Sequence, residues 1–175
     1  MKTKKSILLG MLIAFGILGI WGFRQNARNT LQSEAIADIY SLTGETVTYE
    51  GRENSTSSSY YGKHHYSSSN YDYYYDQDIG FLTNIISKRD IDYDLPDISF
   101  SSIETSADTL LQNNIGDMLP ATAQKDAKEI SGYSYLIQYF GQIDDMQIPY
   151  GDICYTNSGV LLFANFNDQI GRAHV

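Results

Sequence analysis

Apolar residues recur at helical spacing in three stretches of the chain, and each stretch predicts an amphipathic helix. These stretches are residues 29–42, 78–87 and 105–119. Their apolar positions are Leu31, Ala35, Ile39 and Leu42, then Phe81, Leu82, Ile85 and Ile86, then Ala107, Leu110, Leu111, Ile115 and Met118. Residues 121–130 are expected to add a further short helical turn or two.

Alternating apolar and polar residues predict strands elsewhere. The predicted strands are residues 46–50, 97–103, 133–140, 147–156 and 160–166. The last three follow one another closely, with Gly141 and Gly159 in the turns between them. We therefore expect an α+β fold with a small antiparallel sheet, a C-terminal three-strand meander, and helices packed on one face.

The N-terminus carries the pattern of a membrane segment. Three lysines within Met1–Lys5 precede Ser6–Phe23, which has 18 residues and no charge. As a helix this run is about 27 Å long, close to the hydrocarbon thickness of a bilayer. The lysines predict a cytoplasmic N-terminus and an extracytoplasmic C-terminal domain in a single-pass protein. The alternative is a cleaved signal peptide and a secreted protein.

This interpretation divides the chain into segments. Residues 1–28 form a basic tip and a signal anchor, residues 29–45 a helical stalk, and residues 46–169 an extracytoplasmic α+β domain. The last six residues, 170–175, resemble the translation of a sequencing adapter, and our hypothesis is that the native chain is cut off near Asp168.

Residues 51–78 differ in composition from the rest of the domain. They are rich in tyrosine and serine, and aliphatic side chains are absent. Such a segment buries too little apolar area to order itself, so it is predicted to be a disordered surface loop. Tyrosine and serine are also the residues of adaptable binding loops. The candidate binding residues are Tyr60, Tyr61, Tyr66, Tyr71, Tyr73, Tyr74 and Tyr75; the alternative is an insertion with no function.

Charge and cysteine content exclude several classes of function. The net charge is −9, which argues against nucleic acid as a partner. Residues 1–28 and 170–175 together contain six basic residues and no acidic residue. Residues 29–169 therefore carry a net charge of −15. A single cysteine, Cys154, rules out an internal disulfide or a multi-cysteine zinc site, and its apolar strand predicts a buried thiol.

An acidic run offers the one candidate metal site. Asp90, Asp92 and Asp94 alternate with apolar residues and share one face of an extended chain, where their oxygens suit Ca²⁺. The run does not fit an EF-hand, because Leu95 occupies the position of the glycine. The alternative is a solvated acidic strand edge. His64 and His65 are adjacent, so they share no face of a helix or strand and are not predicted to bind a metal ion together. We predict no cofactor.

The C-terminal segment, residues 133–168, contains four short motifs: Tyr135–Tyr139, Ile143–Asp145, Asp152–Ile153 and Ser158–Leu161. With these motifs the segment resembles PepSY-like and YcdB-like bacterial extracytoplasmic domains. The aspartate pair stands where such domains often have Asp-Gly. The resemblance implies a helix on an antiparallel sheet, an N-terminal anchor, and an inhibitory, chaperone-like or binding role. It transfers no functional residue.

Together these features predict a membrane-anchored, non-catalytic module that binds a protein or another component of the cell envelope. No nucleophile elbow, phosphate-binding loop or dinucleotide fingerprint is present in the sequence. Two alternatives remain open: a truncated envelope enzyme whose site lies beyond this chain, and a Ca²⁺-dependent surface adhesion domain.

Overall fold

A computed structural model describes residues 29–167, except for residues 91, 93, 131 and 144–145. The chain divides into two compact units, Met1–Glu34 and Ala35–Val175. Residues 29–34 of the first unit are helical, and the helix continues to residue 43 in the second unit. The second unit contains every described strand.

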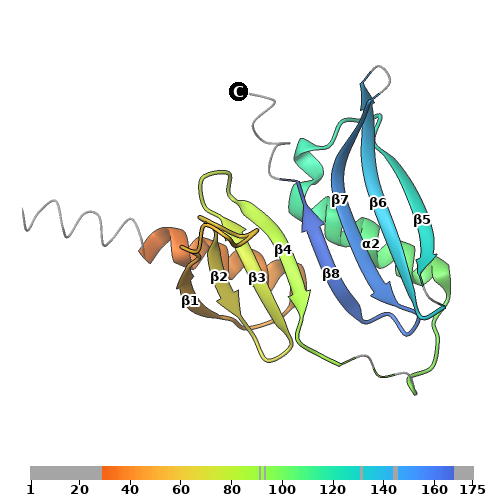
Figure 1. Ribbon diagram of the computed structural model, residues 1–175, viewed down its shortest axis with the longest axis horizontal. Helices are drawn as coiled ribbons and strands as arrows, with labels where there is room; N and C mark the ends of the chain where they lie inside the picture. Colours follow the sequence, from red (N-terminus) through yellow and green to blue (C-terminus); the bar gives the residue numbers. More distant parts are fainter. Residues whose placement is uncertain (1–28, 91, 93, 131, 144–145, 168–175) are drawn as a thin grey trace, which may run out of the picture. The chain divides into compact units, whose positions relative to one another are not determined.

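The second unit is built on one antiparallel sheet of eight strands, in the order β1-β2-β3-β4-β8-β7-β6-β5 (Figure 1). The strands are β1 (Thr48–Arg52), β2 (His64–Ser67), β3 (Tyr71–Asp76), β4 (Phe81–Ser87), β5 (Gln124–Ile130), β6 (Ser134–Ile143), β7 (Met146–Thr156) and β8 (Leu161–Phe166). Helix α2 (Phe100–Ile115) and a 3₁₀ turn, η1 (Gly116–Met118), lie between β4 and β5 in the sequence.

The order of elements repeats within the chain. A helix followed by a four-strand meander occurs first in residues 35–87 and again in residues 100–166. The two meanders join through β4 and β8, the last strand of each, which pair antiparallel. The sheet is therefore two similar halves placed edge to edge.

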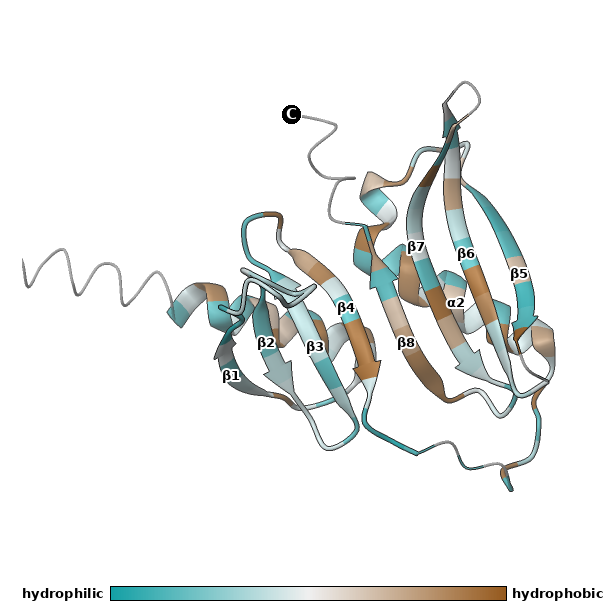
Figure 2. Cartoon of the chain, viewed as in Figure 1, coloured by the Kyte–Doolittle hydropathy of each residue, from teal (hydrophilic) through white to brown (hydrophobic). Residues whose placement is uncertain are grey.

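Helices cover one face of the sheet. On α2, apolar residues at helical spacing are buried against the strands: Ile103, Ala107, Leu110, Leu111 and Ile115. Ala35 and Ile39 of the first helix belong to the same core. Hydrophobic residues are concentrated on the central strands, whereas β2 and β5 are largely hydrophilic (Figure 2). Both helices are therefore held to the sheet by burial of apolar area.

In each half a sheet tyrosine also anchors the covering helix. The Tyr75 hydroxyl donates to Asp38 Oδ2 at 2.6 Å, and the Tyr139 hydroxyl donates to Asp108 Oδ1 at 2.8 Å. Hydrogen bonds to ionised carboxylates are among the stronger ones in proteins.

The predicted fold class was wrong in the extent of the sheet. The C-terminal meander is present as β6, β7 and β8, but it is part of an eight-stranded sheet rather than a small one. The predicted transmembrane segment lies outside the described residues. Within the part of the chain that the structure describes, no helix is long and apolar enough to cross a membrane.

Three local predictions were also wrong. Residues 81–87, expected in a helix, form β4: Asp78 donates its N–H to Asp76 Oδ1 in a tight turn instead of capping a helix. Residues 124–130 form the edge strand β5, whose seven residues are all exposed and so leave no apolar signal. Residues 97–103 form no strand: Ser99 caps α2 by accepting the Ser102 N–H at 3.2 Å, and residues 100–103 are the first turn of that helix.

The segment predicted as a disordered loop, residues 51–78, instead contains β2 and β3. Tyr66 and Tyr73 are completely buried and replace the missing aliphatic residues. Tyrosine favours strands and buries a large apolar ring, so this part of the core is built from aromatic side chains. The predicted stalk also differs from the structure at Ala35 and Ile39, which are buried in the core.

Candidate functional site

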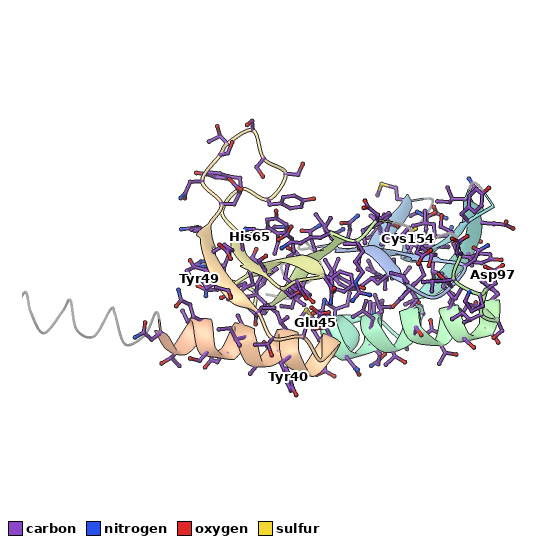
Figure 3. The ribbon with its side chains drawn as sticks, turned by 90° about the horizontal axis from the view of Figure 1, so that it is seen from below. Tyr40, Glu45, Tyr49, His65, Asp97 and Cys154 are labelled. Carbon is purple, nitrogen blue, oxygen red and sulfur yellow. The ribbon has the colours of Figure 1, made fainter. Side chains whose placement is uncertain are left out.

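No helix of the described residues lies on the second face of the sheet (Figure 3). We call it the helix-free face. Strand alternation divides the five candidate tyrosines of β2 and β3 between the two faces, and the other two lie in the β1–β2 loop. Tyr66, Tyr71, Tyr73 and Tyr75 point to the helix side, and of these Tyr66, Tyr73 and Tyr75 are buried where no partner protein can reach them. Tyr60 and Tyr74 lie on the helix-free face, and Tyr61 is 59% exposed in the loop beside them.

An aromatic stack stands on the helix-free face. The Tyr60 and Tyr74 rings stack at 3.9 Å between centroids with 17° between their planes. On β2, the His65 ring stacks on Tyr74 at 4.9 Å and 9°. The three rings come from the β1–β2 loop, β3 and β2. We call them the aromatic stack.

The loop that brings Tyr60 over Tyr74 is closed by backbone hydrogen bonds. The Glu53 N–H donates to Lys63 O, and the Gly62 N–H donates to Glu53 O, both at 2.8 Å. Gly62 has a φ of +85°, a conformation that side chains with a Cβ rarely adopt. This ordering holds the Tyr60 ring in place before any partner binds.

Charged groups flank the stack on β3 and after β4. Asp72 Oδ1 lies 2.8 Å from His65 Nε2 and 3.1 Å from Lys88 Nζ. Partial burial raises the pKa of Asp72, but the hydrogen bonds from His65 and Lys88 outweigh it, so the pKa lies below its ordinary value. Asp72 is therefore an ionised acceptor that fixes the orientation of the His65 ring.

A row of polar side chains crosses the helix-free face at right angles to the strands. Its members lie directly opposite one another in the strand registers: His65, Tyr74, Asn84, Asn165, Asp152, Gln138 and Asp126. Asn84 Nδ2 donates to Asn165 Oδ1 at 2.9 Å, and Gln138 Nε2 donates to Asp152 Oδ1 at 3.0 Å. We call this set the polar row.

An apolar row runs beside the polar row. It comprises Ile86, Phe163, Cys154 and Leu136, again paired by register. Ile86, Phe163 and Leu136 are half-buried, although neither described helix covers them. Cys154 is 3% exposed, which confirms its predicted burial, and burial raises the pKa of its thiol against the opposing effect of Ser134. A buried, protonated thiol is a poor nucleophile.

Basic residues gather around the aromatic stack. Residues 29–169 contain six bases, and three of them lie at the ends of β1, β2 and β4 beside the stack: Arg52, Lys63 and Lys88. The Arg52 Nε donates to Gly62 O at 2.8 Å, and Lys63 Nζ to Asn84 Oδ1 at 3.4 Å.

The three aspartates predicted as a weak Ca²⁺ site lie after β4. Asp90 and Asp92 line a cavity of about 220 Å³ together with Arg89, whose positive charge opposes a bound cation. Asp94 is exposed, and its N–H donates to Asp92 Oδ1 at 3.0 Å. Nowhere in residues 29–167, the five undescribed positions aside, do three or more His, Cys, Asp or Glu gather as a metal site.

Reasoning from the sequence missed most of the polar row. Alternation in the predicted strands 147–156 and 160–166 already places Asp152 and Asn165 on the face opposite to their neighbours Ile153 and Ala164, so these two were detectable. Asn84 was not, because its segment was predicted as a helix.

The helix-free face as a whole is a preformed surface of stacked rings, amides and a few charges. Comparison of the chain with protein-family models, with curated proteins and with solved structures finds no match.

Proposed function

We propose that this protein is a binding module that recognises another protein through its helix-free face. The observation that carries the proposal is the aromatic stack, Tyr60–Tyr74–His65, on the sheet face that none of the described helices covers. Stacked tyrosines present large amphipathic area and lose little side-chain entropy on binding. Such residues are common energetic centres of protein interfaces.

The composition of the face supports a protein rather than a small molecule as the partner. The polar and apolar rows extend across seven and four strands, respectively, away from the stack. Amide side chains that pair with each other, such as Asn84 with Asn165, retain donors and acceptors for a second chain. The nearby Arg52, Lys63 and Lys88 favour a neutral or acidic patch on that partner.

The location expected from the sequence is part of the proposal. The lysines of Met1–Lys5 and the uncharged run Ser6–Phe23 support a signal anchor, with the domain outside the cytoplasm. The partner we propose is accordingly another protein of the cell envelope.

Two equally exposed tyrosines allow a matched test. Tyr61 lies beside the aromatic stack and Tyr40 lies on the first helix, and each is 59% exposed. A photo-crosslinking phenylalanine analogue at position 61 of the full chain should capture one specific protein in intact cells, and the analogue at position 40 should not. Mass spectrometry then identifies the captured protein.

Binding of the purified partner gives the quantitative test. Tyr60→Ala and Tyr74→Ala should each weaken the affinity by about 10-fold or more, as expected for interface anchors. Tyr40→Ala should leave the affinity unchanged. Equal crosslinking from positions 40 and 61, or an unchanged affinity for both stack variants, would overturn the proposal.

A further inference from the structure

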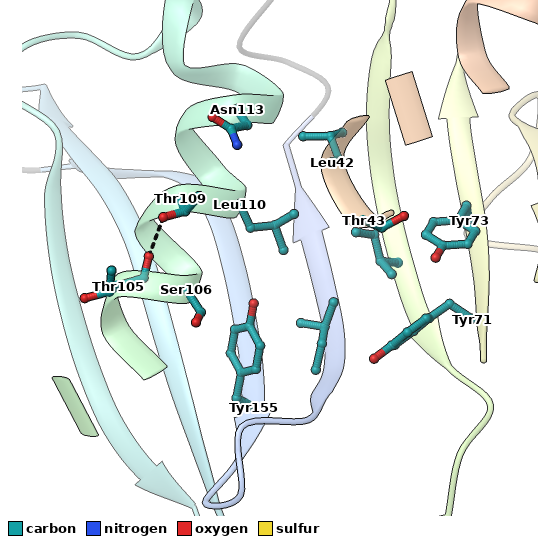
Figure 4. Close-up of a pocket in the computed structure, with 12 residues that line it drawn as sticks. Leu42, Thr43, Tyr71, Tyr73, Thr105, Ser106, Thr109, Leu110, Asn113 and Tyr155 are labelled. Carbon is teal, nitrogen blue, oxygen red and sulfur yellow. Dashed lines mark hydrogen bonds between the residues drawn. The ribbon is translucent and has the colours of Figure 1, made fainter. Parts of the chain in front are cut away.

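A cleft of about 350 Å³ opens on the helix-covered face, between the end of the first helix and α2 (Figure 4). Its inner surface is formed by apolar and aromatic side chains, of which Tyr73, Ile85, Leu110 and Tyr155 are buried. Along its edge, α2 presents Thr105 and Thr109, one helical turn apart. The cleft therefore combines an aromatic floor with a rim of hydroxyl groups.

The chemistry of this lining excludes a charged ligand. The twelve lining residues that the structure describes include no Asp, Glu, Lys, Arg or His. Arg89 lies over the Tyr71 ring, 5.5 Å from its centroid, but it is paired with Glu45 at 3.9 Å. A carboxylate or an ammonium group would therefore lose its hydration here without gaining an unpaired counter-ion. Neutral hydroxyl and phenol groups are suited to an uncharged molecule.

One buried group in the cleft wall lacks a partner. The Tyr73 side chain is completely buried, and its hydroxyl has no hydrogen-bond partner among the described residues. Burial raises the pKa of Tyr73 against the opposing effect of the nearby Thr43 and Ser68 hydroxyls, but neither hydroxyl lies in hydrogen-bonding geometry with it. Buried polar groups are normally satisfied, so the unpaired Tyr73 hydroxyl is a donor available to an oxygen acceptor of a bound molecule.

Two further phenols face the same space. Tyr71 of β3 and Tyr155 of β7 lie on opposite sides of the cleft. Burial raises the pKa of Tyr155 to about 12 and also raises that of Tyr71, so both remain protonated donors at neutral pH.

We propose that this cleft is a binding site for a small uncharged molecule with a hydrocarbon ring and at least one oxygen acceptor. A closed cavity of ~150 Å³ already holds benzene, so 350 Å³ accommodates a substituted or two-ring compound. The site is independent of the proposed protein interface, because the two lie on opposite faces of the sheet.

The test uses three probes of similar shape: benzyl alcohol, benzoate and benzylammonium. Full-length protein with ¹³C-labelled Ile and Leu methyl groups is titrated with each probe and followed by NMR. Benzyl alcohol should shift the Ile85, Leu110 and Leu161 methyl signals in a saturable manner. It should leave Leu136, which lies on the helix-free face, unchanged. Benzoate and benzylammonium should bind at least about 10-fold more weakly.

Two variants separate the site from non-specific partitioning. Tyr73→Phe removes only the free hydroxyl and should weaken benzyl alcohol binding several-fold, whereas the control Tyr61→Phe should not. Thr109→Trp places a bulky ring at the exposed rim and should abolish the shifts without altering the core. The proposal is overturned if benzyl alcohol causes no saturable shifts, if all three probes bind equally, or if neither Tyr73→Phe nor Thr109→Trp changes binding.

Discussion

The side-chain amide of Asn114 pairs with the backbone of Leu82 as a neighbouring strand would. Its Nδ2 donates to Leu82 O at 2.8 Å, and its Oδ1 accepts the Leu82 N–H at 3.2 Å. The ladder between β4 and β8 covers only residues 84–86 of β4, so no strand in the described part of the chain pairs with Leu82 on that side. Asn114, on α2 of the second half, thus provides hydrogen bonds for the backbone N–H and C=O of a strand in the first half.

We expect Asn114→Ala to lower the free energy of unfolding by about 1–3 kcal/mol, because it leaves both backbone groups of the buried Leu82 unpaired. Urea denaturation followed by circular dichroism measures the change. Its neighbour Asn113 is exposed on the same helix, and Asn113→Ala should change stability by less than about 0.5 kcal/mol. Equal effects of the two substitutions would contradict this role.

Gly141 on β6 leaves room for the ring of Tyr150. A Cβ at position 141 would collide with the Tyr150 hydroxyl and ring. Gly141→Ala should therefore destabilise the protein by about 1–3 kcal/mol through overpacking. Gly116→Ala is the control: its Cβ meets only the end of the exposed Gln112 side chain, which can move away. A thermal melt that ranks the two variants in the opposite order would refute the packing argument.

Alkaline pH should destabilise the protein through its tyrosines. Burial is the largest cause of a raised pKa at six of them: Tyr66, Tyr71, Tyr73, Tyr74, Tyr139 and Tyr155. The unfolded chain releases these protons near pH ~10, whereas folded Tyr66 and Tyr155 hold theirs to about 12. Stability is therefore intact below pH ~10 and falls as the pH rises above it.

The measurement is the urea midpoint at about pH 8 and about pH 11, which should be clearly lower at the higher pH. Tyr155→Phe cannot ionise and should reduce the difference between the two midpoints. A midpoint that stays the same in the wild-type protein would show that these phenols do not resist ionisation.

Acid should weaken the interactions of Asp72 with His65 and Lys88 beside the aromatic stack. The folded pKa of Asp72 is depressed, so its contribution to stability is complete above the unfolded value of about 3.9 and is lost as the pH falls below it. Asp72→Asn should remove this part of the acid dependence. Asp94 is exposed after β4, and Asp94→Asn serves as the comparison. Identical acid titrations of stability for wild type and Asp72→Asn would contradict the prediction.

The sequence predicted the elements whose apolar residues follow a clear period. The C-terminal strands and the core positions of α2, from Ala107 to Ile115, were found in this way. It did not predict β3, because the tyrosines of Tyr71–Asp76 have the composition of a surface loop and yet form an aromatic core. It did not predict β5 either, because an exposed edge strand has no buried face to reveal it.

The candidate site was found only in part for a related reason. Tyr60 and Tyr74 were named among seven tyrosines, but composition alone gives no strand register and cannot separate them from Tyr73 and Tyr75. The polar row also depends on strand register, which brings residues far apart in the sequence together. Asn84 and Asn165, for example, are 81 residues apart in the chain.

The short ladder between β4 and β8 has a consequence for the order of folding. Every other strand pairing within the described residues joins strands consecutive in the sequence, so each meander forms from local contacts. The β4–β8 pairing has three residue pairs and must close a long loop, which is the slow step in sheet formation. Both rows of the helix-free face cross this junction. A nascent chain would therefore acquire a complete recognition surface only at its last folding step, after β8 has emerged.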